Sequence, residues 1–106
     1  MNPRIVIVAY KPKPGMESNL KVLTLNHHPR LREQDLVTDR LPIIMKSKDG
    51  TIIEVFEWKS EDAIQQAHTN KVVGQLWVEF SEVCDYIPIG QLPESSELFA
   101  NYSPVI

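Results

Sequence analysis

Hydrophobic and polar positions alternate along the chain with two periods, one typical of strands and one typical of helices. Residues 4–10 (RIVIVAY) form a nearly continuous β-branched run, which is typical of a strand buried on both faces. The next segment predicts a helix, because apolar residues recur every three or four positions while polar groups occupy the other faces. We expect Pro29 to end or kink this helix, since proline lacks an N–H and disfavours helical geometry at the preceding residue. The apolar side of the helix comprises Met16, Leu20, Leu23 and His27.

Two further strands follow and predict a hairpin. Residues 36–46 alternate apolar and polar side chains, and residues 51–58 (TIIEVFEW) are again rich in β-branched and aromatic groups. Asp49-Gly50 lies between these strands, and Asp-Gly between two extended runs is a strong signal for a tight turn. Pro42 cannot donate a hydrogen bond to a ladder, so we expect it on an edge strand or at a bulge.

A second helical segment begins after Ser60, whose hydroxyl suits the N-cap position. This segment should pause at residues 69–70, where Asn70 can cap a new start. Beyond the pause an apolar stripe predicts a continuing helix with polar groups on its outer side. The stripe comprises Val73, Leu76, Trp77, Phe80 and Cys84.

The complete order of elements predicts an α+β fold of the ferredoxin-like type. Residues 86–91 (YIPIGQ) form the fourth strand, and Pro88 places it at an edge of the sheet. The order β-α-β-β-α-β puts both helices on one face of an antiparallel sheet, with the first and third strands at its centre. Residues 92–106 are predicted to be a C-terminal extension with a short helical turn and a tail.

The third strand is apolar on both faces, so the sheet needs a cover on its second face as well. Ile53 and Val55 point to one face, and Ile52, Phe56 and Trp58 point to the other. A monomer would leave one of these sets in water as a large apolar patch. Closed two-fold dimers are the commonest oligomers, so we expect a homodimer through the sheet face, which is a dimeric α/β barrel.

Bulk composition fits one globular domain spanning residues 1–106. The apolar fraction is 42%, the charged fraction is 24% and the net charge is −3, with no face that concentrates Lys and Arg. These values argue against nucleic-acid binding, which needs a basic footprint.

The opening apolar run is too short to span a membrane and no signal-peptide cleavage site follows it. The one cysteine suits a reducing compartment, so we expect a cytoplasmic protein.

The third strand and the helix after it carry a recognisable pattern, which runs from Gly50 to Ser60 (GTIIEVFEWKS) and on to Ala63 and Ala67-His68. It resembles the antibiotic biosynthesis monooxygenase-like proteins of the dimeric α/β barrel superfamily. Those proteins have a strand that ends in an aromatic residue, a K/R-S/D turn, and a helix with a histidine. The element order matches over residues 4–91, so the resemblance implies the same fold. It also implies activities that include cofactor-free oxidation of aromatic polyketides, haem degradation, and small-molecule isomerisation or decarboxylation.

The haem-degrading branch of that superfamily has its own pattern of residues. Its members carry an asparagine on the first strand and a tryptophan in the second helix, with a histidine further along. Here the first strand ends Ala9-Tyr10, Ala67 lies near the tryptophan position, and Trp77 stands where the histidine should be. We therefore expect no haem degradation, and we expect no other cofactor.

His68 is the first candidate for a functional side chain, because the periodicity places it on the apolar side of its helix. The small residues Ala63 and Ala67 leave room beside it for a ligand between helix and sheet. A neutral imidazole there can bond a phenol or act as a base. The alternative is a buried structural histidine that donates to a backbone carbonyl at the helix break. A site would require one ring nitrogen of His68 to face a cavity.

Other candidates are the hexapeptide 27–32 (HHPRLR) and Glu54. Two histidines and two arginines near a helix end can contact an anionic ligand, although His27 and His28 diverge on a helix and cannot both face one pocket. The alternative is a solvated helix end, and no metal site is expected because no third or fourth ligand is placed by sequence. Glu54 shares a strand face with apolar side chains, so it needs a partner, either Arg40 across the hairpin or a histidine in the pocket.

Two functions stay open at this point. The first is binding of a small apolar or aromatic molecule between helices and sheet without catalysis. The alternative is a cofactor-free monooxygenase-like enzyme acting on an aromatic small molecule, with His68 as the candidate catalytic residue. The sequence offers no paired base and orienting group, which favours binding, and Cys84 is expected to be inert packing. The expected ligand-binding residues are His68, Trp58, Phe56, Trp77, Tyr10, Glu54 and His27, although aromatic residues at these spacings are often plain core.

Overall fold

A five-stranded antiparallel sheet forms the centre of the molecule, with the strand order β4-β1-β3-β2-β5. The structure is a computed structural model and describes residues 2–106. As predicted, β1 and β3 lie inside the sheet, each paired on both sides. The strands are β1 (Arg4–Pro12), β2 (Ile43–Lys46), β3 (Ile52–Trp58), β4 (Cys84–Ile87) and β5 (Ser103–Pro104).

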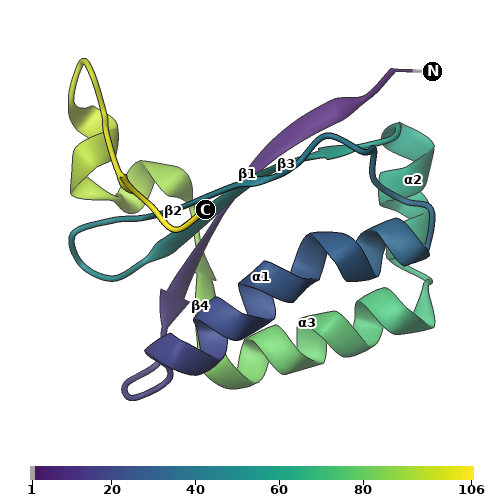
Figure 1. Cartoon of the computed structure of the whole chain (residues 1–106), viewed down its shortest axis with the longest axis horizontal. Helices are drawn as coiled ribbons and strands as arrows, with labels where there is room; N and C mark the ends of the chain where they lie inside the picture. Colours follow the sequence, from purple (N-terminus) through teal and green to yellow (C-terminus); the bar gives the residue numbers. More distant parts are fainter. Residues whose placement is uncertain (1) are drawn as a thin grey trace.

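The helices α1 (Glu17–Glu33), α2 (Glu61–Ala67) and α3 (Lys71–Val83) lie on one side of this sheet (Figure 1). Their apolar sides meet the helix-facing side chains of β1 and β3 in the main core. The arrangement is an α+β fold compatible with the ferredoxin-like fold expected from the sequence. The core side chains contributed by the helices include Leu20, Leu31, Val73, Leu76 and Phe80.

Local turn and cap signals in the sequence are confirmed. Gly50 has a φ of 93°, in the left-handed region that favours glycine, and lies in the turn between β2 and β3. The side-chain oxygen of Asn70 accepts from the N–H groups of Val72 and Val73 at 2.9 and 3.1 Å. Ser60 caps α2 in the same way. The predicted pause therefore separates α2 from α3.

The fourth strand is an edge of the sheet, as predicted, but neither Pro42 nor Pro88 lies within a strand. Pro42 precedes β2, which begins at Ile43 rather than at residue 36, and Pro88 follows β4, which begins at Cys84 rather than at residue 86. Proline has no N–H for a ladder, and here each proline stands where a strand begins or ends. The second strand is also not an edge, because β5 pairs with it on the side away from β3.

Of the two effects expected from Pro29, an end to the first helix is not observed, because α1 continues through it to Glu33. A proline inside a helix removes the hydrogen bond of its own N–H and crowds the preceding turn, but its fixed φ is compatible with a helix. The actual end is set by Asp35, whose φ of 59° is left-handed. The Leu36 N–H then donates to Leu31 O at 3.3 Å, and both leucines are buried. This hydrogen bond and apolar contact are typical of a Schellman motif.

Replacing this proline should stabilise the fold. The substitution Pro29→Ala restores a donor inside α1 and removes the clash of the ring with the preceding turn. The unfolded chain gains conformational freedom, which offsets part of the effect. We expect a net gain of about 1–2 kcal/mol in the free energy of unfolding, measured by urea denaturation. A loss of stability in Pro29→Ala would contradict the view that the proline is a cost to α1. Pro14→Ala, outside the helices, serves as control.

The face of the sheet away from the helices is partly covered by residues 88–102, here called the C-terminal arm (Figure 1). The arm contains two 3₁₀ turns, Ile89–Gln91 and Pro93–Ser96, and Leu92 is buried beside Ile53. The Glu94 carboxylate anchors the arm, because it accepts from the Ser47 hydroxyl and the Lys48 N–H.

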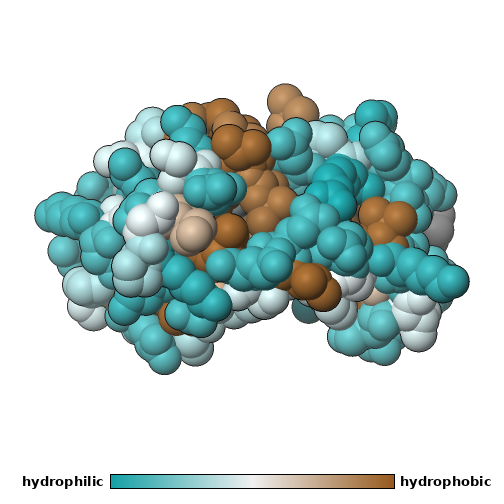
Figure 2. Space-filling view, turned by 90° about the horizontal axis from the view of Figure 1, so that it is seen from below, coloured by the Kyte–Doolittle hydropathy of each residue, from teal (hydrophilic) through white to brown (hydrophobic). Residues whose placement is uncertain are grey.

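Apolar side chains remain exposed next to the arm. Ile5, Ile7 and Ile43, on the face away from the helices, are 58%, 54% and 57% exposed. Apolar groups also gather in the middle of the face seen in Figure 2, between polar flanks. No helix in residues 2–106 combines the length and the apolar character that a membrane crossing requires.

Candidate functional site

Three polar side chains meet in the layer between the helices and the sheet. The Tyr10 hydroxyl of β1 donates to Glu54 Oε1 of β3 at 2.8 Å, and Nδ1 of His27 from α1 lies 2.7 Å from the same oxygen. An ionised carboxylate only accepts hydrogen bonds, so Nδ1 of His27 donates. The exposed fractions of Tyr10, His27 and Glu54 are 1%, 6% and 0%. We refer to these three residues as the Glu54 cluster.

Sheet register and helix periodicity bring the Glu54 cluster together. Tyr10 pairs with Ile52 across β1 and β3, and Glu54 follows two residues later on the same face of the sheet. His27 lies on the buried side of α1, which packs over that face. The other buried residues of α1 are Leu20, Thr24, His28 and Leu31.

Aromatic rings enclose the Glu54 cluster. The Tyr10 ring stacks on Phe80 with centroids 4.7 Å apart. The His27 ring meets Phe56 and Phe80 edge-on, at 5.3 and 5.1 Å. These apolar surroundings make a charged carboxylate costly unless its oxygens are hydrogen-bonded.

One oxygen of that carboxylate is not satisfied. Glu54 Oε2 is buried and has no hydrogen-bond partner among residues 2–106. An unsatisfied buried polar atom costs about 1–3 kcal/mol. The second ring nitrogen of His27, Nε2, also makes no hydrogen bond within the described part of the chain. The cluster therefore has an open acceptor on Glu54 and a histidine whose orientation the same carboxylate fixes.

The structure brings five of the seven expected binding residues close to one another, and it decides the partner of Glu54. A histidine, not Arg40, contacts Glu54, and Arg40 instead lies 3.3 Å from Glu57. Trp58 is buried and its ring lies 5.3 Å from that of Phe56. The five are Tyr10, His27, Glu54, Phe56 and Trp58.

His68 and Trp77 lie outside this group. His68 is exposed, against the expectation of a buried ring, and its Nδ1 lies 2.9 Å from Ile64 O. The ring meets Trp77 edge-on at 5.6 Å, and Trp77 is itself 39% exposed. The physical reason is that α2 ends at Ala67, so His68 stands at the C-cap and the apolar side of the helix does not extend to it. No ring nitrogen of His68 lines a pocket found among the described residues.

His27 and His28 are both buried, so the interpretation of a solvated helix end is wrong for these two residues. They point to different partners, as adjacent helical residues must. His28 Nε2 lies 3.1 Å from Thr38 O and therefore donates to this carbonyl. Burial of both follows from the continuation of α1 past Pro29, which keeps this segment packed against the sheet and the loop after the helix.

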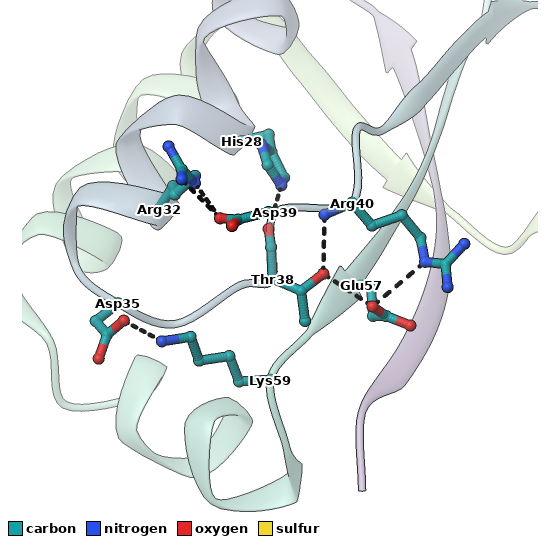
Figure 3. Close-up of polar contacts among 8 residues, drawn as sticks. All are labelled: His28, Arg32, Asp35, Thr38, Asp39, Arg40, Glu57 and Lys59. Atoms are coloured by element: carbon teal, nitrogen blue, oxygen red, sulfur yellow. Dashed lines mark hydrogen bonds and ion pairs between the residues drawn. The ribbon is translucent and has the colours of Figure 1, made fainter.

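A polar network surrounds His28 and holds the loop between α1 and β2 (Figure 3). Arg32 pairs with Asp39 at 2.6 Å, and the Thr38 hydroxyl donates to Glu57 at 2.8 Å. Lys59 pairs with Asp35 across the start of the loop. Most of these charged groups are exposed and already paired, so they secure the loop rather than offer a free site.

A groove opens at one end of the helix–sheet layer. Its volume is about 430 Å³, within the range of small-molecule pockets. One wall is the first turns of α1, and the opposite wall is the C-terminal strap, defined as residues 103–106. Its floor includes Ile52, two residues before Glu54 on the same strand face. The lining residues are Glu17, Ser18, Lys21, Lys46, Gly50, Ile52, Ser103, Pro104 and Val105.

The three tyrosines should resist ionisation in the folded protein. Burial, followed by the charge of Glu54, raises the pKa of Tyr10 well above 10.0. Burial also raises the pKa of Tyr86 to about 12 and raises that of Tyr102. The tyrosines of the unfolded chain ionise at a lower pH than those of the folded protein. The contribution of the neutral, buried phenols to the free energy of unfolding is therefore complete below about pH 10 and is lost as the pH rises above it. Phenolate absorbance at pH 10 should be strong in urea and weak without it; equal signals would contradict the burial of Tyr10.

The thiol of Cys84 is buried, as expected of a packing side chain. Burial raises its pKa to about 11, so the reactive thiolate is scarce at neutral pH. Within residues 2–106 no group of three His, Cys, Asp or Glu side chains is arranged to hold a metal ion.

The fold and the Glu54 cluster define a small α+β protein with a buried polar site between helices and sheet. No protein-family model matches the sequence, and no curated protein matches it. Among solved structures, the chain is similar to Rv0793 from Mycobacterium tuberculosis, with a TM-score of 0.65 and 19% sequence identity. The match covers 81% of this chain and 89% of that one. At this identity the similarity concerns the fold, and it is in keeping with the ferredoxin-like arrangement.

Proposed function

We propose that this protein binds a small apolar or aromatic molecule between its helices and its sheet, at the Glu54 cluster. The observation that carries the proposal is the buried Oε2 of Glu54, which has no donor among residues 2–106. A ligand with an O–H or N–H group would supply that donor. The rings of Phe56 and Phe80, next to His27, suit an aromatic body.

A purely structural role explains the Glu54 cluster less well. A buried ion pair is often no more stabilising than well-packed apolar side chains of the same volume. A carboxylate kept for structure would also be expected to have both oxygens bonded, as those of the buried Glu94 are. Glu54 instead concentrates two donors on one oxygen and leaves the other open.

The proposal is tested with 2-naphthol and 2-methoxynaphthalene. Both contain the naphthalene ring system, but only 2-naphthol has an O–H group that can donate a hydrogen bond. Calorimetric titration should show 2-naphthol binding about tenfold or more tightly, since a hydrogen bond to a charged group contributes about 1.5–3 kcal/mol. Glu54→Gln should reduce this preference. Glu57→Gln, on the opposite face of the same strand, should keep it. Equal affinities of the wild-type protein for both compounds, or no binding of either, would refute the proposal.

A cofactor-free monooxygenase-like activity is the second candidate. It is favoured by the pairing of His27 Nδ1 with Glu54, because a carboxylate that orients a histidine leaves Nε2 available as a base. The measurement is oxygen uptake with 1,8-dihydroxynaphthalene. Uptake above the uncatalysed rate that is lost in His27→Gln would favour the enzyme over simple binding.

We further propose that the protein is a homodimer of the dimeric α/β barrel superfamily, located in the cytoplasm. The resemblance over Gly50–Ser60 supports the antibiotic biosynthesis monooxygenase-like family, and the exposed Ile5, Ile7 and Ile43 support association through the sheet face. A second copy would cover these side chains and bury more than roughly 1,200 Å² in total, the lower bound for stable specific interfaces.

A further inference from the structure

The groove beside the C-terminal strap lies on the same strand face as the Glu54 cluster but does not include its residues. Ile52 lines the groove, and Glu54 follows two residues later on the same strand face. Ile44 pairs with Glu54 in the ladder, and its carbonyl accepts from the N–H groups of Val105 and Ile106 at 2.8 and 3.1 Å. The strap therefore runs along the strand next to Glu54, with Val105 packed against the main core.

The charge in the groove is opposite to that of the whole chain. Lys21 from α1 and Lys46 from β2 both line it, and Glu17 is the one acidic side chain in its lining. Neither lysine forms an ion pair with any of residues 2–106. The groove therefore combines two unpaired ammonium groups with an apolar floor. This positive charge lies in a protein whose net charge is −3, so it marks the groove as a place for an anion.

We propose that this groove binds the carboxylate of an apolar acid, with Lys21 and Lys46 as its contacts. The apolar body of the ligand then lies along Ile52 and Val105, which line the groove. This inference goes beyond the proposed function, because the groove shares no lining residue with the Glu54 cluster. The volume of about 430 Å³ suits an acid of one or two aromatic rings.

The test compares 1-naphthylacetate with the neutral 1-naphthylacetamide, which has the same body without the charge. Calorimetry gives the affinities, and amide chemical shifts of Ile52 and Val105 show whether each compound enters the groove. We expect the wild-type protein to prefer the acid about three- to tenfold, as two partly exposed ion pairs allow. This preference should shrink in high salt and disappear in Lys21→Ala/Lys46→Ala. Lys71→Ala, which removes one positive charge at the start of α3, away from the groove, should retain it.

The outcomes separate the two proposals. If both compounds bind equally and shift the Ile52 and Val105 amides, the groove is a ligand site but its preference for an acid is wrong. A preference that survives in Lys21→Ala/Lys46→Ala, or that Lys71→Ala abolishes, also overturns the assignment to this groove. If neither compound shifts these amides, the groove is no ligand site, and binding of 2-naphthol then decides the proposed function independently.

Discussion

Ile7→Lys should leave the protein monomeric at micromolar concentration, while the wild-type chain sediments as a dimer. Ile7 is 54% exposed on β1, beside Val55 of β3, on the face away from the helices. In a face-to-face dimer this side chain lies in the dry centre of the interface. A lysine there would bury an unpaired charge, which costs about 3 kcal/mol or more, so the dimer should weaken more than a hundredfold.

A matched control is available on the other side of the molecule. Val22 of α1 is 60% exposed, so Val22→Lys makes a similar change from an exposed apolar side chain to a charge. It should leave the sedimentation coefficient unchanged. A wild-type protein that sediments as a monomer would defeat the barrel, and so would a dimer that tolerates Ile7→Lys but not Val22→Lys.

His27→Ala should be the most destabilising single change in the Glu54 cluster, lowering the free energy of unfolding by about 3–5 kcal/mol. The substitution removes one of the two donors on Glu54 Oε1 and leaves a carboxylate that is 0% exposed with Tyr10 alone. It also opens a cavity between Phe56 and Phe80, whose rings contact the imidazole. Urea denaturation measures the loss.

Two further variants are compared with His27→Ala: a substitution of the neighbouring His28, and a variant in which apolar side chains replace the whole Glu54 cluster. His28→Ala removes a hydrogen bond to a neutral carbonyl and should cost clearly less than His27→Ala. The triple variant Tyr10→Phe/His27→Leu/Glu54→Leu removes the buried charge and both donors together, so it should recover much of the stability. Equal losses in His27→Ala and His28→Ala would show that the charge of Glu54 is not what makes His27 important.

The sequence predicted the elements whose signals are local. Asp49-Gly50 specifies its turn through backbone geometry, and Asn70 specifies a helix start through its side chain, so both were predictable from a few residues. The strand β5 has only two residues and no period of its own, and it forms because β2 offers a free edge. The end of α1 at Glu33, set by the left-handed Asp35, is not predicted from the sequence because the proline signal at Pro29 is stronger than that of an aspartate.

The candidate site was also predictable only where the signal was local. Glu54 on an apolar strand face and His27 on the apolar side of a helix each indicated burial, but their pairing depends on how α1 crosses the sheet. His68 was misplaced because a repeat of three or four residues cannot show that α2 stops after seven. The lysines of the groove gave no signal in sequence, because Lys21 and Lys46 come together with the C-terminal strap only in the folded chain.

The most direct test of ligand binding at the Glu54 cluster is the carboxyl ¹³C resonance of Glu54 during titration with 2-naphthol. A donor that reaches Oε2 changes the hydrogen bonding of this carboxylate and therefore its chemical shift. We predict that the Glu54 resonance moves with the same dissociation constant that calorimetry gives, while that of Glu57 on the opposite face stays in place. Saturation with 2-naphthol that leaves the Glu54 resonance unmoved would contradict a ligand site at the cluster.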